Sequence, residues 1–316
     1  MPRFITFTPN PALDVSTAVD RLVDAHKLRC DAPQRHPGGG GINVARVLHR
    51  LGAEVLAVYP CGGATGEQLH GLLATEGVPD LRLPIAGETR ESFTVHARDS
   101  GGEYRFVLPG PTLSPAEWAA ALRSLQSLPT APAWVVASGS LPPGVAEDGH
   151  AHIARTAKAL GARAVVDSSG AALQAALREG VWLVKPSLRE LGELTGTPLE
   201  TRAAQRQAAR RLIELGQAQM VALSLGSEGA MLVTADQCLH ADALPVSVAG
   251  SVGAGDSFLA GLVWALDTQT DLRQALATAM AAGAAAVMRP GTELCQPQDV
   301  ARLREQVRVQ ACLDAA

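Results

Sequence analysis

Short runs of β-branched and apolar residues recur along the chain, and most end at a proline, glycine, serine or aspartate. Such runs predict strands that are buried on both faces. The predicted strands cover residues 4–8, 55–59, 134–138, 164–167, 182–184 and 221–225. Segments rich in alanine, leucine and arginine separate them and follow the helical period, which predicts helices at 43–51, 66–76, 117–126, 149–160, 173–179 and 202–215. The alternation indicates an α/β fold in which helices cover both faces of a mainly parallel sheet.

Two segments depart from this pattern, residues 14–36 and 89–108, which read as extended chain. In the second, Phe93 and Val95 alternate with polar residues before a Gly-containing turn, and Tyr104 and Phe106 do so after it. This pattern predicts a hairpin. We expect a small projecting β-sheet with one apolar face and one face toward a ligand cleft. It would serve as a lid, or as a surface meander that a partner subunit stabilises, and the two are compatible.

The composition narrows the class of protein. The chain has 316 residues, of which 47% are hydrophobic, enough for the core of one large domain spanning 1–316. The net charge of −4 provides no basic field for nucleic acid or an anionic membrane, so we expect a small ligand held by particular residues. The N-terminal segment is too short and interrupted for a secretion signal, and no apolar run reaches membrane-spanning length.

The cysteines and histidines predict no metal centre. The five cysteines are odd in number and scattered without Cys-x-x-Cys spacing, which argues against a disulfide framework and is typical of a cytoplasmic protein. His150 and His152 are the nearest pair with metal-ligand spacing, but no third ligand accompanies them. We interpret these two histidines as part of a solvated loop.

Gly253, Ala254, Gly255 and Asp256 precede an apolar helical run at 258–266 and form the most informative stretch of the chain. Glycines allow a tight turn whose N–H groups point outward, and the positive end of the helix dipole adds to them, so this loop is suited to hold an anion. A carboxylate in such a loop is repelled by the anion, which is understandable if Asp256 takes a proton from a hydroxyl beside a phosphate. On these residues alone, an ordinary helix cap remains open.

A second informative site is the run of four glycines from Gly38 to Gly41, followed by Asn43 at the start of a predicted helix. The glycines allow the backbone to approach a ligand closely, and the amide of Asn43 can both donate and accept. The spacing matches neither a Walker loop nor a dinucleotide-binding fingerprint. A sugar or polyol packed against backbone fits better, while a flexible linker is disfavoured because an amphipathic helix begins at once.

Several separated motifs, in order, resemble the PfkB branch of the ribokinase-like sugar kinases. They are residues 38–45 (GGGGINVA), 138–144 (SGSLPPG), 166–170 (VDSSG), 184–186 (VKP), 224–229 (SLGSEG) and 252–257 (VGAGDS). The resemblance spans nearly the whole chain and implies a ribokinase-like three-layer α/β/α sandwich with a β-sheet lid, and ATP- and magnesium-dependent phosphorylation of a sugar.

Within the family, the resemblance is strongest to members that phosphorylate fructose 6-phosphate at its 1-hydroxyl, through residues 27–30 (KLRC), the four glycines and residues 104–107 (YRFV). Relatives that act on fructose 1-phosphate or tagatose 6-phosphate typically carry Gly-Lys-Gly in part of the glycine run. Those two sugars remain alternatives. A sugar-phosphate sensor without activity is a further alternative, which Asp256 disfavours because a sensor needs no base in its anion loop.

The resemblance also assigns roles to residues. Asp256 would be the base, and the backbone from Gly253 through Ala254 and Gly255 would hold the charge of the transferred phosphoryl group. The substrate-binding residues would be Asp14, Gly39, Gly40, Asn43 and Gly139 for the sugar, and Lys27, Arg90 and Arg105 for its phosphate. Guanidinium groups suit a phosphate because they donate two parallel hydrogen bonds. Family members pair through the lid, so a homodimer is expected.

For the nucleotide, the resemblance implies binding by Lys185, Ser187, Ser224, Gly226 and Gly229. Glu190 matches an acidic residue that holds Mg²⁺ through water. Ser187 stands where the family usually has asparagine, so its polar reach is shorter. Carbonyl groups near Val252, Ala286 and Gly291 match a site for a monovalent cation, K⁺, found in many relatives.

Overall fold

The computed structural model describes residues 2–268 and 271–312. Its large sheet has the strand order β14-β13-β12-β11-β10-β9-β8-β1-β4-β5. The strands are β1 (Phe4–Phe7), β4 (Val55–Cys61), β5 (Asp80–Pro84), β8 (Trp134–Ser138), β9 (Arg163–Asp167), β10 (Val181–Val184), β11 (Ala218–Ser224), β12 (Ala230–Val233), β13 (Cys238–Ala241) and β14 (Val309–Ala311). Neighbours from β5 to β11 are parallel, whereas β12, β13 and β14 pair antiparallel. The sheet is therefore mainly parallel, as predicted.

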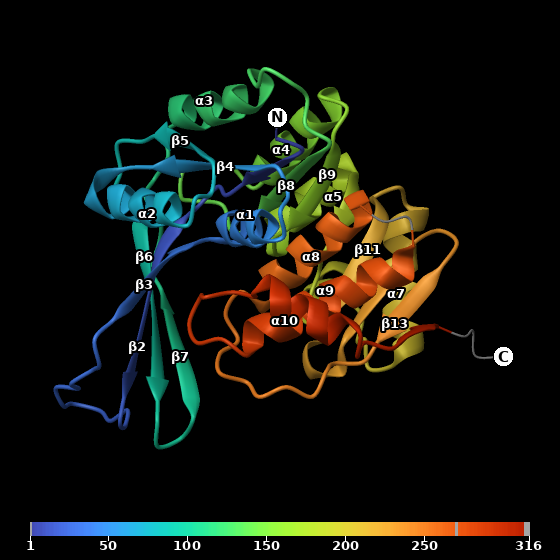
Figure 1. Ribbon diagram of the computed structural model, residues 1–316. Coiled ribbons are helices and arrows are strands. Elements are labelled where there is room, and N and C mark those ends of the chain that lie inside the picture. The colour runs from blue at the N-terminus through green and yellow to red at the C-terminus, as the bar shows by residue number, and fades with distance from the viewer. Residues whose placement is uncertain (1, 269–270, 313–316) are drawn as a thin grey trace.

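Helices cover both faces of this sheet (Figure 1). One face carries α1 (Gly40–Arg50), α2 (Gly63–Thr75), α8 (Ala254–Thr268), α9 (Leu272–Val287) and α10 (Pro297–Arg304). The other carries α3 (Pro115–Gln126), α4 (Gly149–Ala159), α5 (Gly170–Glu179), α6 (Leu188–Thr195) and α7 (Arg202–Glu214). Because side chains alternate along a strand, Trp134 packs in the first core and Val135 in the second. The three-layer α/β/α prediction is confirmed.

A second sheet projects from one end of the large one, at the lower left of Figure 1, with strand order β3-β2-β6-β7. Its strands are β2 (Ala12–Val19), β3 (Gln34–Gly38), β6 (Arg90–Ala97) and β7 (Gly102–Val107). The 14–36 segment is extended only at its ends, because residues 20–33 form no strand. The 89–108 segment is the predicted hairpin.

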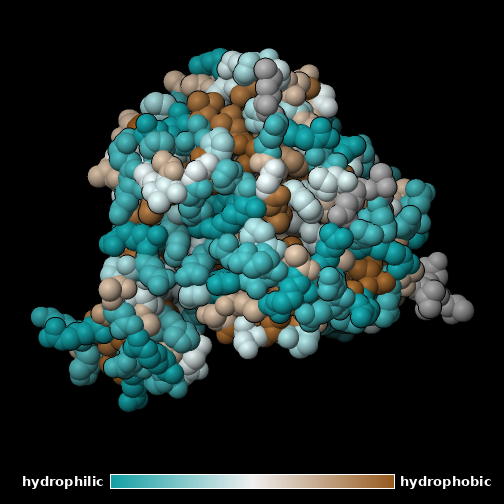
Figure 2. Space-filling view, in the orientation of Figure 1, coloured by the Kyte–Doolittle hydropathy of each residue, from teal (hydrophilic) through white to brown (hydrophobic). Residues whose placement is uncertain are grey.

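The two faces of the small sheet differ in polarity. Asp14 pairs with Ser92 and Thr94 with Arg105, so these polar residues share one face. Phe93 pairs with Phe106 on the opposite face, where Phe106 stays 51% exposed. Figure 2 shows mainly hydrophilic residues over the outer end of this sheet in that view. Within residues 2–268 and 271–312, no helix combines the length and apolarity needed to cross a membrane.

Candidate active site

A cavity of about 400 Å³ lies between the carboxyl ends of the large sheet's strands and the polar face of the small sheet. Residues that are remote in sequence line it together: Asp14, Asn43, Arg90, Arg105, Lys185 and Asp256. Ligands of open α/β sheets bind beyond the carboxyl ends of strands, at this kind of edge. A neighbouring cavity of about 630 Å³ shares Arg90 and Ser140 with the first. Candidate residues for the sugar, its phosphate and the reaction thus meet at one place.

Asp256 lies in the first turn of α8, directly after a glycine turn. Gly253 has φ 78°, a left-handed conformation that other residues adopt at a cost, and a side chain there would overlap Leu294. The first N–H groups of a helix have no partner within the helix. The amides of Ala254, Gly255 and Asp256 therefore provide donors and the positive end of the helix dipole for an anion.

The carboxyl group of Asp256 is a base whose affinity for protons is raised. Burial raises its pKa to about 6, and the nearby carboxylate of Asp167 adds to the rise. The amide of Asn43 opposes it, because Nδ2 of Asn43 donates to Oδ2 of Asp256 at 2.8 Å. A carboxylate with this pKa is ionised at neutral pH yet accepts a proton more readily than an exposed one.

Lys185 forms a buried ion pair in the same cavity. Its Nζ lies 3.1 Å from Oδ1 of Asp167 at the end of β9. Burial alone would lower the pKa of Lys185, but the carboxylates of Asp167, Asp256 and Glu190 together outweigh burial and raise it, so the ammonium remains charged. Burial raises the pKa of Asp167, and Lys185 opposes that rise. A fixed positive charge thus stands beside Asp256, where a phosphoryl group would arrive.

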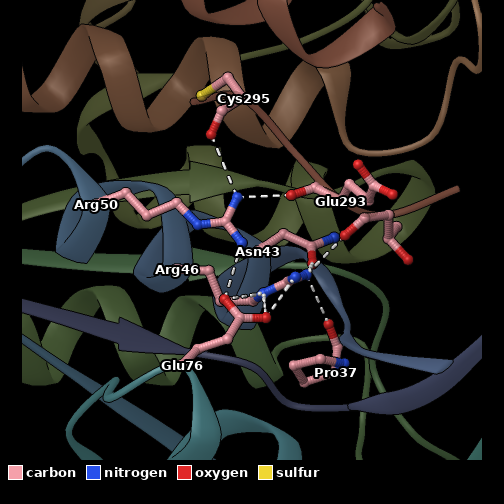
Figure 3. Close-up of polar contacts among 8 residues, drawn as sticks. Pro37, Asn43, Arg46, Arg50, Glu76, Glu293 and Cys295 are labelled. Carbon is pink, nitrogen blue, oxygen red and sulfur yellow. Dashed lines mark hydrogen bonds and ion pairs between the residues drawn. The ribbon is translucent and has the colours of Figure 1, made fainter. Parts of the chain in front are cut away.

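Asn43 is itself held by a buried arginine, shown in Figure 3. Arg46 follows one turn later on α1 and is 0% exposed. Its Nη1 donates to Oδ1 of Asn43 at 3.4 Å, and its Nη2 lies 2.7 Å from Oε1 of Glu76. Arg50 binds the same Glu76 carboxylate, Nη2 to Oε2 at 2.9 Å. Helix α1 is therefore anchored by two cations, one near its middle and one at its last residue, that share one anion.

The part of the cavity lined by the small sheet combines one buried carboxylate with two arginines. Burial raises the pKa of Asp14, while a hydrogen bond with Thr292 and the charge of Arg105 act against that rise. Arg90 donates from Nη2 to the carbonyl of Asn10 at 3.1 Å, and its buried Nε has no hydrogen-bond partner in the described structure. A donor left without a partner costs free energy, which a bound anion would relieve.

The glycine run is in close contact with neighbouring backbone. Gly39 has φ 106°, and a Cβ there would lie 2.7 Å from Cγ2 of Thr8. A Cβ on Gly40 would overlap the hydroxyl of Ser138 and stand 3.1 Å from the amide nitrogen of Gly139. Gly39, Gly40 and Gly139 also line the cavity. Part of what the sequence assigned to ligand approach is thus close packing of α1 against the loop after β8.

The predicted nucleotide residues lie along the same edge of the sheet. Ser187 and Glu190 form a capping box at the start of α6: the Ser187 hydroxyl accepts from the Glu190 amide at 3.3 Å, and Oε2 of Glu190 accepts from the Ser187 amide at 2.8 Å. Serine caps a helix about as well as asparagine, so the departure from the family leaves the helix start intact. Ser224 pairs with Ser187, and Gly226 follows β11.

The backbone conformation at residue 229 requires glycine. Its φ is 99°, and a Cβ there would overlap the carbonyl oxygen of Ala241. Ser224, Gly226 and Gly229 do not line the 400 Å³ cavity, whereas Lys185 and Glu190 do. The cavity thus brings Asp256, Lys185 and Glu190 together, while Ser224, Gly226 and Gly229 lie outside it.

The residues that the resemblance assigns to metal ions differ in whether they line a cavity. Val252 and Gly291 line a small cavity beside Arg105, whereas the carbonyl of Ala286 accepts from the amide of Arg289 at 3.0 Å. The part of the chain that the structure describes contains no group of three His, Cys, Asp or Glu residues arranged to hold a metal ion. Mg²⁺ commonly keeps waters and binds substrate phosphates with only one or two carboxylates, so Glu190 at the cavity fits that mode.

Two residues that the sequence singled out, Lys27 and His150, do not line the cavity. Lys27 is exposed in the segment between β2 and β3 and does not line the cavity of its own chain. The solvated-loop interpretation is wrong for His150, which is 0% exposed in α4 with its Nε2 at 2.9 Å from the carbonyl oxygen of Gly139. Burial lowers its pKa to about 4, so a neutral His150 donates to that carbonyl beneath the loop after β8.

Arg46 is the residue near this site that sequence reasoning missed. Its signal is a charged residue three positions after Asn43, among the buried apolar residues of α1. Asp167 was visible only as part of a motif, and its ion pair with Lys185 joins the last residue of β9 to the residue that follows β10. Such partners follow from sheet order, which the residues alone do not specify.

Comparison with known proteins agrees with this geometry. Residues 12–299 match the model of the pfkB family carbohydrate kinases. An ATP-dependent 6-phosphofructokinase isozyme 2 of Mycobacterium tuberculosis is 45% identical over 304 residues, covering 96% of this chain and 89% of that protein. A 1-phosphofructokinase of Xanthomonas campestris is 39% identical over 282 residues, covering 87% and 88%.

Solved structures give the same result. Phosphofructokinase-2 of Escherichia coli in complex with fructose-6-phosphate superposes with a TM-score of 0.91 at 38% identity, covering 97% of this chain and 99% of that one. That enzyme has also been solved with potassium and in a tetrameric inhibited form. The chain belongs to the pfkB family of carbohydrate kinases.

Proposed function

We propose that the chain is a 6-phosphofructokinase, which transfers the γ-phosphoryl group of ATP to the 1-hydroxyl of fructose 6-phosphate and so makes fructose 1,6-bisphosphate, a step of glycolysis. One observation carries this proposal: Asp256, with its pKa raised to about 6, stands at a helix N-terminus in a cavity that also holds Arg90 and Arg105. We place the reaction in the cytoplasm, where ATP and sugar phosphates are available.

In the proposed reaction, Asp256 accepts the proton of the sugar 1-hydroxyl as its oxygen attacks the γ-phosphorus. The amides of Ala254 and Gly255 stabilise the negative charge that develops on the phosphoryl oxygens, and the ammonium of Lys185 adds a fixed positive charge. Mg²⁺, when bound with Glu190 through water, neutralises nucleotide phosphate charge.

Arg90 and Arg105 are proposed to bind the phosphate that the sugar already carries. Both line the cavity from the small sheet, Arg90 on β6 and Arg105 on β7. A phosphate held there places the far end of the sugar toward Asp256. Asp14, on the same face as Ser92, is proposed to orient a sugar hydroxyl.

We further propose that two chains pair through the apolar face of the small sheet, which then acts as a lid. Tyr104 is 41% exposed and Phe106 is 51% exposed, and both neighbour Phe93 and Val95 on that face. Exposed apolar residues gathered on one face are typical of an interaction surface. Lys27 remains a predicted phosphate ligand, which its own chain does not bring to the cavity.

A second candidate function is 1-phosphofructokinase activity, which the similarity to the Xanthomonas campestris protein favours. Fructose 1-phosphate and tagatose 6-phosphate both present a hydroxyl and a phosphate at separations close to those of fructose 6-phosphate. A non-catalytic sensor of sugar phosphates would bind these compounds without consuming ATP.

A substrate panel tests the proposal. The purified protein is given ATP, Mg²⁺ and one of the three sugar phosphates, and ADP release is followed with a coupled assay, with Asp256→Asn as the control. We expect the highest kcat/KM with fructose 6-phosphate and no turnover by the variant above background. A higher kcat/KM with another sugar would reassign the substrate, and sugar binding without ADP release would support the sensor.

A further inference from the structure

Arg46 is a buried cation that the proposed mechanism does not use. It donates from Nη1 to the carbonyls of Pro37 and Thr292, each at 3.0 Å, besides its contact with Asn43. Its Nε donates to Glu76 at 2.9 Å, and its Nη2 binds the same carboxylate. Burying a charge costs free energy unless the charge is paired and hydrogen-bonded, so the partners of Arg46 indicate which groups it positions.

The guanidinium fixes which way the Asn43 amide points. Arginine has only donors, whereas an asparagine side chain has one acceptor oxygen and one donor nitrogen. With Oδ1 facing Arg46 at 3.4 Å, Nδ2 must face Asp256, to which it donates at 2.8 Å. The reversed amide would set its NH₂ group against the Arg46 guanidinium, the contact drawn in Figure 3, and its oxygen against the Asp256 carboxylate, and both contacts would be repulsive.

Arg46 also joins segments from separate parts of the fold. Pro37 belongs to β3 of the small sheet, and Thr292 belongs to the loop between α9 and α10. Thr292 makes a side-chain hydrogen bond with Asp14, the candidate sugar ligand. One side chain thus contacts the small sheet, the loop that supports Asp14 and the amide that holds Asp256.

We propose that Arg46 is a positioning residue for phosphoryl transfer: it fixes the amide of Asn43, which in turn holds the carboxylate of Asp256 in place and ionised. This inference rests on the proposed kinase function. It differs from a purely structural role, because it predicts that Arg46 controls the protonation of Asp256 and not only the stability of the fold.

The first test is Arg46→Lys, which keeps a positive charge but loses the planar set of donors. We expect kcat to fall about 10-fold or more and the acidic limb of its pH profile to rise by about half to one pH unit, since a lost hydrogen bond to a carboxylate favours its protonated form. Asn43→Ala should raise the limb in the same way, and the double variant should raise it no further. Asp167, Lys185 and Asp14 also face this carboxylate and stay unchanged in every variant.

Arg50→Lys is the matched control. Arg50 shares Glu76 with Arg46 and donates from Nη1 to the carbonyl of Glu293 at 2.6 Å, but none of its hydrogen bonds reaches Asn43. We expect this variant to lose stability without a shift of the acidic limb. Equal limb shifts in the two lysine variants, or an unshifted limb in a folded Arg46→Lys protein, would overturn the proposal.

Two additions keep the test decisive. If Arg46→Lys does not fold, Arg46→Met removes the cation and leaves the Glu76 carboxylate paired with Arg50, so no buried charge is left without a partner. A readout without turnover is the gain in melting temperature caused by Asp256→Asn, followed against pH, which reports the protonation of Asp256. The midpoint of this gain should move upward in the Arg46→Lys background. An unmoved midpoint contradicts the proposal, whereas absent kinase activity with a moved midpoint contradicts only the proposed function.

An independent observation concerns Cys238 and Cys312, at the far edge of the large sheet. Leu239 pairs with Ala311, so the two cysteines are directly opposite, and the amide of Cys312 donates to the carbonyl of Cys238 at 2.8 Å. Opposite residues joined in this way have Cα atoms about 5.5 Å apart, within the range of disulfides. Each thiol is the group that most affects the pKa of the other.

The surroundings make one of these thiols reactive. Cys312 is half-buried and lines a cavity of about 550 Å³ together with Arg202 and Arg206. The hydrogen bond from Cys238 and the nearby arginines lower the pKa of Cys312 to about 7. Cys238 is buried beside it. An accessible thiolate next to a second thiol is the arrangement of cysteines that respond to oxidants.

We infer that Cys238 and Cys312 form a disulfide when the protein meets a peroxide. The Cys312 thiolate attacks one oxygen of the peroxide, and the O–O bond breaks. Cys312 becomes a sulfenic acid, and the departing oxygen takes up a proton and leaves as water. The Cys238 sulfur then attacks the Cys312 sulfur, the S–O bond breaks, and a second water leaves. Two thiols lose two electrons and two protons, and one peroxide is reduced to two waters.

Titration of the full chain with hydrogen peroxide tests this inference. We expect the intact mass to fall by two hydrogens, and peptide mapping to find one link, between residues 238 and 312. Cys312→Ser should abolish the link, Cys238→Ser should leave a sulfenic acid that dimedone traps, and Cys30→Ser, which removes an exposed thiol, should change nothing. A link to another cysteine, or oxygen addition to the parent protein without a link, would overturn the inference.

Discussion

Replacing Asp256 by asparagine should separate catalysis from stability. The substitution removes the proposed base and keeps the shape of the side chain, and its carbonyl oxygen can still accept from Nδ2 of Asn43. We expect kcat to fall by at least 10²–10⁴-fold. We also expect the folded protein to become more stable, because the native carboxylate is ionised in a buried place.

The size of this gain follows from the raised pKa. Burial takes the pKa of Asp256 from 3.8 to about 6, and each unit corresponds to about 1.4 kcal/mol, so the ionised group destabilises the fold by about 3 kcal/mol at neutral pH. For a chain of this length, that difference corresponds to about 4 °C in melting temperature.

The raised pKa also sets the direction in which the stability of the wild type changes with pH. The folded state binds its proton more tightly than the unfolded chain, so the wild type loses stability as the pH rises from about 4 to about 6, and the variant does not. The gain is therefore complete above pH 6 and falls to about a third at pH 4.5.

Thermal melts of both proteins at equal concentration, at pH 7.5 and 4.5, provide the measurement. Equal stability at pH 7.5, or a gain that does not change with pH, would refute the conclusion that this carboxylate is desolvated. Retained sugar-phosphate binding by the inactive variant serves as the control for an intact site.

Three further outcomes are expected. Arg90→Ala and Arg105→Ala should each raise the sugar-phosphate KM at least 10-fold and the ATP KM less than threefold, and an unchanged sugar KM in both would reject the phosphate assignment. Gly229→Ala should destabilise the protein by about 2 kcal/mol or more in denaturant unfolding, because its φ is 99° and its Cβ would overlap a carbonyl, while Gly226→Ala, with open space around it, should cost about 1 kcal/mol. Chelation of divalent cations should stop turnover until Mg²⁺ is added back, and full activity in excess chelator would contradict the magnesium requirement.

Much of the fold could be predicted because its central strands are short apolar runs between helices of clear period. The run at 134–138 coincides with β8, and the helix predicted at 202–215 differs from α7 by one residue. The antiparallel strands β12, β13 and β14 were not predicted. They have three or four residues each, which is too short for an alternation to stand out.

The sequence identified a candidate site residue only where the pattern immediately around that residue is distinctive. Asp256 follows a glycine turn at the start of an apolar helical run, so its position at a helix N-terminus could be predicted. Its raised pKa depends on burial and on Asp167, which lies 89 positions earlier in the sequence. Arg46 was missed for the same reason, because its role depends on Thr292 and Glu76 from other elements.

The small sheet has candidate sugar-phosphate ligands on one face and exposed aromatic rings on the other, and β7 alone contributes Arg105 to the first and Phe106 to the second. A partner that covers the rings would order the backbone of β7, and the same backbone positions the guanidinium of Arg105. Under the proposed pairing of two chains through these rings, substrate affinity and subunit association would be thermodynamically linked. We therefore expect dilution of the protein to weaken sugar-phosphate binding, and saturation with the sugar phosphate to stabilise the pair of chains.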